Sequence, residues 1–335
     1  MPMLAFERGN WMRRIARALS AMWVGVFALG AAATSAQSQS WPTRPVKLIL
    51  PLGAGSGADI GARLFAEKLS VKWGQPVVVE NRPGGDGFIA ITAFTGAKDN
   101  HVFLWGPAAA FTAHPYLHEK LPYDPSELSP VARVTTTIVS MSVPVALNIN
   151  SMKELIARAK AEPGQLTWAT VTGATDFVFA GWLKMDGLDM LKVPYRDPVT
   201  ALNDLSENRI QVFNSAYAIV RAQAEAGRVK VLAVTNRERF EAIPNVPTVV
   251  EAGAPGLLFD GLVGMYGTRD LPDDVRARIA ADIREIAADP AIRSRIIATA
   301  QGVIPGTSAD LAAAIAEQRR GLEAAAQALG VKAAQ

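Results

Sequence analysis

The sequence predicts an α/β protein of two lobes, each a mostly parallel sheet flanked by helices, joined by hinge crossings. Three observations support this fold class. The chain has 335 residues, half of them apolar, which is enough for two cores. Apolar strands alternate with amphipathic helices in the first third, and the alternation starts again after residue 150. Apolar stretches at residues 136–147 and 257–266 lie between these regions and are expected to carry the chain across and back. Two lobes and a hinge imply a cleft.

Residues 1–36 are predicted to be a cleaved export signal and not part of the fold. Three arginines give the segment a positive start: Arg13, Arg14 and Arg17. An apolar run over residues 18–33 follows, and Thr34 and Ala36 offer a cleavage site. The run is shorter than the roughly 20 residues that a membrane span needs. An uncleaved helix or anchor and a twin-arginine signal are the alternatives.

The charge of the chain is balanced once that segment is removed. The segment carries four arginines and one glutamate, which leaves 30 basic and 30 acidic side chains. With no basic stripe to follow a phosphate backbone, we expect no nucleic-acid partner. The chain has no cysteine, so it offers neither a disulfide nor the residue that a lipid anchor requires. We therefore expect an exported, soluble monomer.

The first lobe is predicted to contain residues 37–143 and 262–335. It opens with a β-α-β-α-β run whose strands are expected at residues 47–51, 76–80 and 102–105. An alternation of this kind favours parallel strands with helices between them.

The second lobe is predicted to span residues 144–261. It begins with a capping box, in which Ser151 and Glu154 mark a helix start. Four strands then alternate with helices, at residues 166–170, 190–195, 210–214 and 229–235. After the return to the first lobe, helices are expected to begin at Pro272 and Ser308.

A glycine-rich loop at residues 53–57, between the first strand and the first helix, is the main candidate site. Glycines let a backbone approach a ligand closely. A helix start presents unpaired N–H groups and a positive dipole end, so it suits an anion. Residues 171–176 form a matching loop before a helix of the second lobe. Because ligands bind at the carboxyl ends of strands in open α/β sheets, the two loops are expected to share a cleft.

Two enzyme functions compete for the first loop. Gly53, Gly55 and Ala58 fit the fingerprint of an NAD(P)-dependent oxidoreductase, and Glu80 ends the next strand 22 residues after Ala58. The export signal counts against this cofactor, which is scarce outside the cytoplasm. Ser56 has the strand–turn–helix setting of a serine hydrolase nucleophile, but alanines replace the glycines that flank such a serine.

The three histidines of the chain lie in one short stretch: His101, His114 and His118. They are the only candidates for a hydrolase base. His114 and His118 are four residues apart with Glu119 adjacent, a spacing that can bind metal. Pro115 lies between them and no third ligand is evident, so a structural loop is predicted, with no metal and no cofactor.

Motifs spread over the mature chain carry a family resemblance. The most specific one is GQPVVVENRPG at residues 74–84. Others follow in order, at residues 41–46, 51–59 with Arg63, 121–125, 162–164, 193–195, 244–248 and 251–253. From Trp41 to about Lys332 the chain thus resembles the receptors of tripartite tricarboxylate transporters, the Bug family of periplasmic binding proteins.

The resemblance implies a periplasmic receptor with a two-lobe Venus-flytrap fold and no catalytic residues. It implies capture of a small carboxylate, for uptake by the membrane components of a tripartite transporter or for sensing. The family holds one carboxylate between the first-lobe and second-lobe loops. Carried over, this implicates Gly55, Ser56, Gly57 and Asp59, with Thr172, Gly173, Thr175 and Asp176 opposite.

Further residues of the glycine-rich loop and near strand ends complete the predicted ligand site: Gly53, Ala54, Gly106, Pro107, Ala108, Phe111, Tyr195, Arg196, Asp197, Asn214 and Ser215. Phe111 has an equal alternative, as a core residue. Arg196 could pair with a distal carboxylate or lie on the surface. Asp197 stands where the family usually has glycine, so it would repel a second carboxylate or accept from a donor of the ligand. Asp59 has an equal alternative, as an acid that favours the helix dipole.

Overall fold

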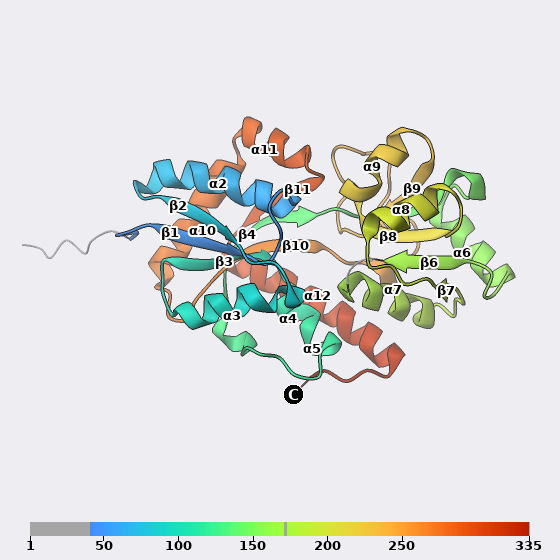
Figure 1. Cartoon of the computed structure of the whole chain (residues 1–335), viewed down its shortest axis with the longest axis horizontal. Helices are drawn as coiled ribbons and strands as arrows, with labels where there is room; N and C mark the ends of the chain where they lie inside the picture. The colour runs from blue at the N-terminus through green and yellow to red at the C-terminus, as the bar shows by residue number, and fades with distance from the viewer. Residues whose placement is uncertain (1–40, 171–172, 335) are drawn as a thin grey trace, which may run out of the picture. The chain divides into compact units, whose positions relative to one another are not determined.

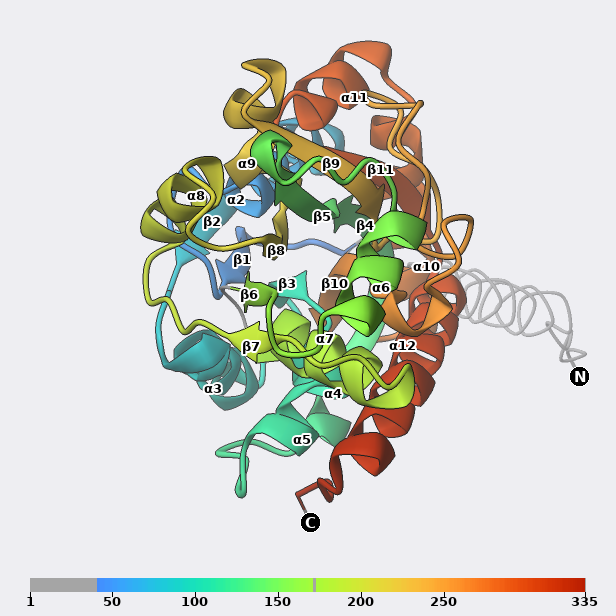
Figure 2. The same ribbon diagram turned by 90° about the vertical axis from the view of Figure 1, so that its right-hand side faces the viewer.

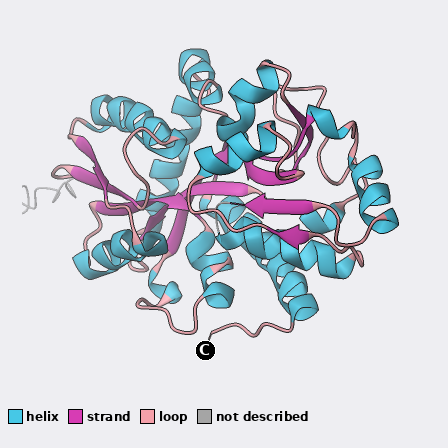
Figure 3. Cartoon of the chain, turned by 45° about the vertical axis from the view of Figure 1, so that its right-hand side comes forward, coloured by secondary structure: helices cyan, strands magenta, loops and turns pink. Residues whose placement is uncertain are grey.

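The computed structural model describes residues 41–170 and 173–334. The predicted export signal and Thr172 lie outside this part of the chain. From Arg44 onward the chain forms two β-sheets flanked by helices (Figure 1). Figure 3 separates the strands of both sheets from the helices around them. Within the described ranges no helix has both the length and the apolar character needed to cross a membrane.

The first sheet has six strands in the order β11-β4-β10-β3-β1-β2. Their bounds are β1 (Val46–Leu50), β2 (Val77–Asn81), β3 (Val102–Pro107), β4 (Ser129–Thr137), β10 (Gly261–Gly267) and β11 (Gln301–Gly306). β1 is parallel to both of its neighbours. β10 is antiparallel to β3 and β4, and β11 is antiparallel to β4. The inner strand β1, between β3 and β2, is an almost continuous apolar run because both of its faces are covered.

The second sheet has five strands in the order β7-β6-β8-β5-β9. Their bounds are β5 (Val139–Pro144), β6 (Thr167–Thr170), β7 (Leu191–Lys192), β8 (Val212–Ala216) and β9 (Val229–Val234). β6 is parallel to β7 and β8, whereas β5 is antiparallel to β8 and β9.

Both sheets are therefore mixed, whereas the alternation in the sequence led us to expect mostly parallel strands. Strands linked through a helix on the same sheet are parallel, as crossover connections require. β5 and β10 instead enter their sheets directly from the other sheet. They start where β8 and β3 end, so they run in the opposite direction.

Helices cover both faces of the first sheet. They are α2 (Gly57–Trp73), α3 (Phe88–Ala97), α4 (Ala109–Thr112), α5 (His114–Leu117), α10 (Asp273–Ala287), α11 (Pro290–Ile297) and α12 (Ser308–Leu329), with single turns η1 (Gly85–Gly87) and η2 (Pro125–Glu127). In Figure 1, α2 and α11 lie on one side of the sheet, and α3, α4 and α12 lie on the other. The ends of α2 follow from local chemistry, because Ser56 caps its first turn and Gly74 ends it at a φ of 66°.

The second sheet is flanked by α6 (Met152–Ala161), α7 (Gly173–Met185), α8 (Pro198–Ser206) and α9 (Tyr217–Glu225), with turns η3 (Val145–Leu147) and η4 (Pro255–Leu257). The Ser151 hydroxyl accepts a hydrogen bond from the Glu154 amide at 3.2 Å, as the predicted capping box requires. The Glu154 carboxylate accepts from the amide of Asn150 instead of that of Ser151.

The two crossings between the sheets are held to each other by one buried side chain. Asn236, on the returning crossing, donates to the Thr136 hydroxyl and the Thr137 carbonyl, each at 3.0 Å. Its carbonyl oxygen accepts from the amide of Val139, also at 3.0 Å. All of these groups flank Ile138, where the chain passes from β4 to β5, so Asn236 lies at the expected hinge.

A helix pair also links the two parts. α12 runs from the first sheet to α7 of the second, and Figure 2 shows the two helices side by side. Gly181 allows the close approach, because a Cβ atom there would lie 2.4 Å from that of Ala325. Apolar residues of both helices pack around this point, among them Phe177, Val178 and Leu322.

Candidate functional site

A cavity of about 500 Å³ lies between the two sheets. The segments that follow β1, β3, β6 and β8 all contribute to its lining. These are carboxyl ends of strands from both sheets, the place where open α/β folds bind ligands. The volume is that of a small-molecule site. We refer to this cavity as the cleft.

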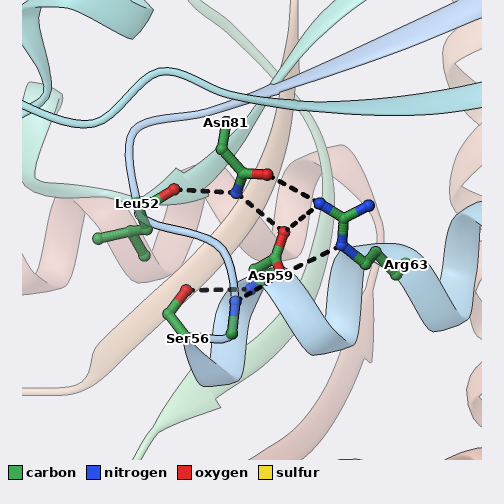
Figure 4. Close-up of polar contacts among 6 residues, drawn as sticks. Leu52, Ser56, Asp59, Arg63 and Asn81 are labelled. Atoms are coloured by element: carbon green, nitrogen blue, oxygen red, sulfur yellow. Dashed lines mark hydrogen bonds and ion pairs between the residues drawn. The ribbon is translucent and has the colours of Figure 1, made fainter.

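The first predicted loop reaches the cleft through Ser56 and Gly57. The Ser56 hydroxyl accepts from the Asp59 amide at 3.3 Å and so caps α2 (Figure 4). Among the described residues, nothing accepts the amide protons of Gly57 and Ala58. Both residues line the cleft, so a helix start with two available donors borders it.

Asp59 stabilises this loop through hydrogen bonds made outside the cleft. It is 2% exposed, and its carboxylate accepts from the Gly55 amide at 2.9 Å, from Arg63 Nε at 3.1 Å and from Asn81 Nδ2 at 2.8 Å (Figure 4). Burial opposes ionisation, but the hydrogen bonds from Arg63, Gly55 and Asn81 outweigh it and lower the pKa of Asp59 below its usual value. Asn81 also donates to the carbonyl of Leu52 at 3.0 Å. Asp59 is not part of the cleft lining; its role as a ligand contact stays a prediction.

The second predicted loop reaches the cleft at the start of α7. Gly173, Ala174 and Thr175 line it, whereas Thr172 lies outside the described residues. Asp176 is not part of the lining. Its carboxylate accepts from the Thr170 hydroxyl at 3.2 Å and forms an ion pair with Lys192 Nζ at 2.7 Å. The helix starts of α2 and α7 therefore border one cavity from opposite sheets.

Ser215 is a predicted site residue whose buried hydroxyl is available to a ligand. It is the next-to-last residue of β8, is 1% exposed and lines the cleft. Within the described part of the chain its hydroxyl has no hydrogen-bond partner. Buried polar atoms without partners are uncommon, so this hydroxyl is well suited to a ligand. Asn214 Oδ1 also lacks a partner but is not part of the lining.

The remaining first-lobe predictions divide into two groups. Pro107 and Ala108 line the cleft. Gly106 lies against Pro51, whose Cγ would be 2.9 Å from a Cβ at this position. Phe111 packs in the core, with its ring 4.9 Å from that of Tyr266. The exposed residues Gly53, Ala54 and Gly55 lie outside the lining.

Three predicted residues of the second lobe lie outside the cleft lining. The Tyr195 hydroxyl donates to Asp204 at 2.6 Å. Asp197 caps α8 by accepting from the Thr200 amide at 2.9 Å. Arg196 is exposed. The local sequence explains these positions, because Asp-Pro at a helix start is a capping arrangement. Ligand contact by these residues stays a prediction.

The sequence analysis missed residues that the return of the chain brings to the cleft. Gln301, at the start of β11, is 5% exposed and accepts from the Thr137 hydroxyl at 3.3 Å. Phe259, Asp260 and Gln318 also contribute to the lining. No short motif marks these positions. For Phe259 and Asp260 the return crossing was an available signal, since a second pass between the lobes must border the cleft.

The charges of the cleft are unusual for an anion site. No lysine or arginine appears among the lining residues in the described ranges, whereas Asp86, His114 and Asp260 do. Burial lowers the pKa of His114 to about 4, so its imidazole is neutral at neutral pH. Amides, hydroxyls and helix dipoles are thus the groups available to hold a carboxylate.

A third ligand for the histidine pair, which the sequence did not reveal, comes from the loop before α3. Asp86 Oδ2 lies 2.9 Å from His118 Nε2 and 3.7 Å from His114 Nε2. Pro115, which counted against a metal pair, occupies the first turn of α5, where proline is tolerated.

The positions of Glu80 and Ser56 give no support to the oxidoreductase and hydrolase alternatives. Glu80, the expected ribose partner, forms ion pairs with Lys47 at 2.7 Å and with Arg82. Ser56 uses its hydroxyl as a helix cap, and among the described residues no histidine hydrogen-bonds it.

Comparisons with known proteins agree on one family. The profile of the tripartite tricarboxylate transporter family receptor matches residues 61–331. A UPF0065 protein of Bordetella bronchiseptica is 32% identical over 287 residues, covering 85% of each chain. The structure of R. palustris Rpa4515 with adipate superposes with a TM-score of 0.73 at 25% identity, over 87% of this chain and 99% of that one. The periplasmic binding protein BugD has a TM-score of 0.68 at 26% identity, over 87% and 99% of the two chains.

Proposed function

The chain belongs to the tripartite tricarboxylate transporter receptor family, and on this premise we propose how it captures a small organic acid in the periplasm. One carboxylate of the acid lies between the starts of α2 and α7. The amides of Gly57 and Ala58 and the Ser215 hydroxyl donate to it. The protein is a receptor and not an enzyme.

One observation carries the proposal: helix starts from both sheets border the same cavity. Each presents a positive dipole end, and the first presents two amides without acceptors among the described residues. An anion between them satisfies donors from both lobes at once. Since neither a lysine nor an arginine lines the described cleft, selectivity rests on hydrogen-bond geometry more than on net charge.

The cleft also suggests the shape of the ligand. Most of its lining is aliphatic or glycine, including Leu52, Ile91, Leu104 and Leu117. Such walls favour a guest with a polar end and an apolar body. The Rpa4515 structure was determined with adipate, a linear dicarboxylate whose methylene chain is such an apolar body. We infer the same class, a linear mono- or dicarboxylate, for this chain.

Capture is coupled to closure of the two lobes. A ligand that contacts both helix starts binds the closed arrangement better than an open one, and so shifts the equilibrium toward it. The crossings at Ile138 and Asn236 are the segments that flex. The closed lobes then present a surface to the membrane components of a tripartite transporter.

The proposal is tested by calorimetric titration with adipate, malate and citrate, and with adipamide as the neutral analogue. At least one acid should bind with a Kd in the micromolar range or below, and adipamide should not. Ser215→Ala should weaken binding by roughly threefold to tenfold, the effect of about one hydrogen bond. It should leave the free energy of unfolding unchanged, because the hydroxyl has no partner in the described part of the protein.

Ser140→Ala is the matched control. Ser140 is an equally buried neighbour on β5 whose hydroxyl donates to the Ser215 carbonyl, and it is not part of the cleft lining. Its loss should leave acid binding unaltered. Equal binding of adipate and adipamide, or an unchanged affinity in Ser215→Ala, would contradict the proposal.

A further inference from the structure

Asp86, His114 and His118 gather three metal-binding side chains at the wall of the cleft. One ligand atom of each lies within 4.8 Å of the others. Asp86 and His114 are themselves part of the lining. The cluster combines two imidazoles and a carboxylate, which is a donor set of transition-metal sites.

The hydrogen bonds of His114 determine which of its nitrogens can bind a cation. Its Nδ1 lies 2.9 Å from the Tyr123 hydroxyl. In the tautomer with the proton on Nδ1, that hydroxyl donates its single proton to the carbonyl of Ala110 at 3.0 Å and its oxygen accepts from His114 Nδ1–H. His114 Nε2 therefore carries a lone pair. A histidine that binds metal characteristically donates its second ring nitrogen to such a neighbour.

The lone pair of His114 faces another acceptor. Its Nε2 lies 3.7 Å from Asp86 Oδ2, and both atoms are acceptors. His118 Nε2 lies 2.9 Å from the same oxygen. A cation bound by all three atoms satisfies the His114 lone pair and neutralises the Asp86 carboxylate beside it.

The surrounding structure holds the donors in place. His114 and His118 lie at the two ends of the single turn α5, where the His118 amide donates to the His114 carbonyl at 3.1 Å. The ring of Phe88 packs against both imidazoles, with centroids 5.1 and 4.6 Å away. Asp86 has a left-handed backbone, with a φ of 53°, between glycines that share such conformations.

We propose that His114 Nε2, His118 Nε2 and Asp86 Oδ2 bind a divalent transition-metal ion of the zinc type. Zinc–nitrogen bonds of roughly 2.0–2.1 Å place two tetrahedral ligands about 3.4 Å apart. The two distances from Asp86 Oδ2, 2.9 and 3.7 Å, bracket that value, and all three ligand atoms lie within 4.8 Å of one another. The half-exposed Asp86 side chain has room to adjust. Imidazole ligands favour zinc over magnesium or calcium, and three protein ligands leave a coordination position open.

The ion supplies positive charge to a cleft whose described lining has no lysine or arginine. It is thus a second anchor for an anionic ligand, on the part of the cleft wall that Asp86 and His114 form. This role in capture rests on the proposed function, whereas the binding of the ion does not.

The test is titration of the chelator-treated protein with ZnCl2 and, separately, with MgCl2. We expect one zinc ion per chain and no magnesium. His118→Gln and Asp86→Asn should each weaken zinc binding by on the order of tenfold to a hundredfold. Asn tolerates the left-handed backbone at position 86, and thermal unfolding without metal checks that both variants fold.

His101→Gln is the control, since His101 is the one histidine of the chain outside the cluster. It should bind zinc as the parent protein does. The proposal is overturned if zinc does not bind, if both cluster variants keep the parent affinity, or if His101→Gln loses zinc equally.

Adipate titrations with and without zinc separate this inference from the proposed function. Adipate binding that zinc strengthens in the parent protein, but not in His118→Gln, supports the role in capture. Adipate binding indifferent to zinc overturns that role and leaves the receptor function standing. Zinc binding without binding of any acid leaves the metal site standing and overturns the proposed function.

Discussion

The two strand–loop–helix units at the cleft share one arrangement, but different contacts stabilise their loops. Both place a helix start at the cleft, and both carry an acid in the first turn of that helix. In the first unit the acid is Asp59, buried and bonded to an amide, a guanidinium and a side-chain amide. In the second it is Asp176, whose side chain is 30% exposed and which pairs with a half-exposed lysine.

The difference suggests unequal roles in capture. A buried carboxylate that organises its own loop reduces the ordering needed when a ligand binds. A surface ion pair contributes little rigidity, since water competes with it. We therefore regard the first loop as the pre-formed half of the anion site and the second as the half that adjusts on closure.

The largest expected effect comes from removing each acid in turn. Asp59→Ala removes a buried carboxylate that accepts three hydrogen bonds, so it should lower the free energy of unfolding by about 2–4 kcal/mol. Asp176→Ala loses a solvent-screened ion pair and one hydrogen bond from the Thr170 hydroxyl, and should cost about 1 kcal/mol. Urea unfolding followed by circular dichroism measures both values. Equal losses would remove the distinction between the loops.

A smaller effect is expected from adding a methyl group to each helix start. At Gly57 a Cβ would lie 2.8 Å from Gln301 Nε2, so Gln301 must move within the cleft lining. At Gly173 it would lie 3.1 Å from Leu117 Cδ1. Because the first loop is the stiffer one, Gly57→Ala should weaken adipate binding by about tenfold, or ~1.4 kcal/mol. Gly173→Ala should weaken it by about threefold, and the reverse order would contradict the comparison.

The smallest effect is the acid dependence that Asp59 contributes. Its pKa in the folded protein lies below the usual value of 3.8, so the ionised form favours folding. This stability is present above pH 3.8 and is lost as the pH falls through the lowered pKa. Asp59→Asn should therefore show a shallower loss of stability between about pH 5 and pH 2, by up to ~1.4 kcal/mol per unit of pKa shift. Urea unfolding across that range measures it, and parallel curves would refute it.

The sequence was informative wherever local pattern decides structure. The predicted family, two-lobe fold and receptor function are confirmed by the comparisons. The strand expected at residues 47–51 is β1, displaced by one residue, because an apolar run between turns suffices to identify it. The strand β11 was missed, since its glycines and Pro305 oppose a strand and only pairing with β4 at the sheet edge permits one. The strand expected at residues 190–195 is limited to Leu191–Lys192, at the other sheet's edge.

By itself, the sequence determined the alternation of strands and helices, the caps of α2 and α6, and the loops that border the cleft. These features depend on hydrogen bonds and periodicities within a few residues. Only the tertiary structure decided that the Asp59 carboxylate accepts from Asn81, that Gln301 enters the cleft, and that Asp86 contacts His118. These contacts join residues that are tens to hundreds of positions apart in the sequence. Packing of the whole chain sets the distances between them.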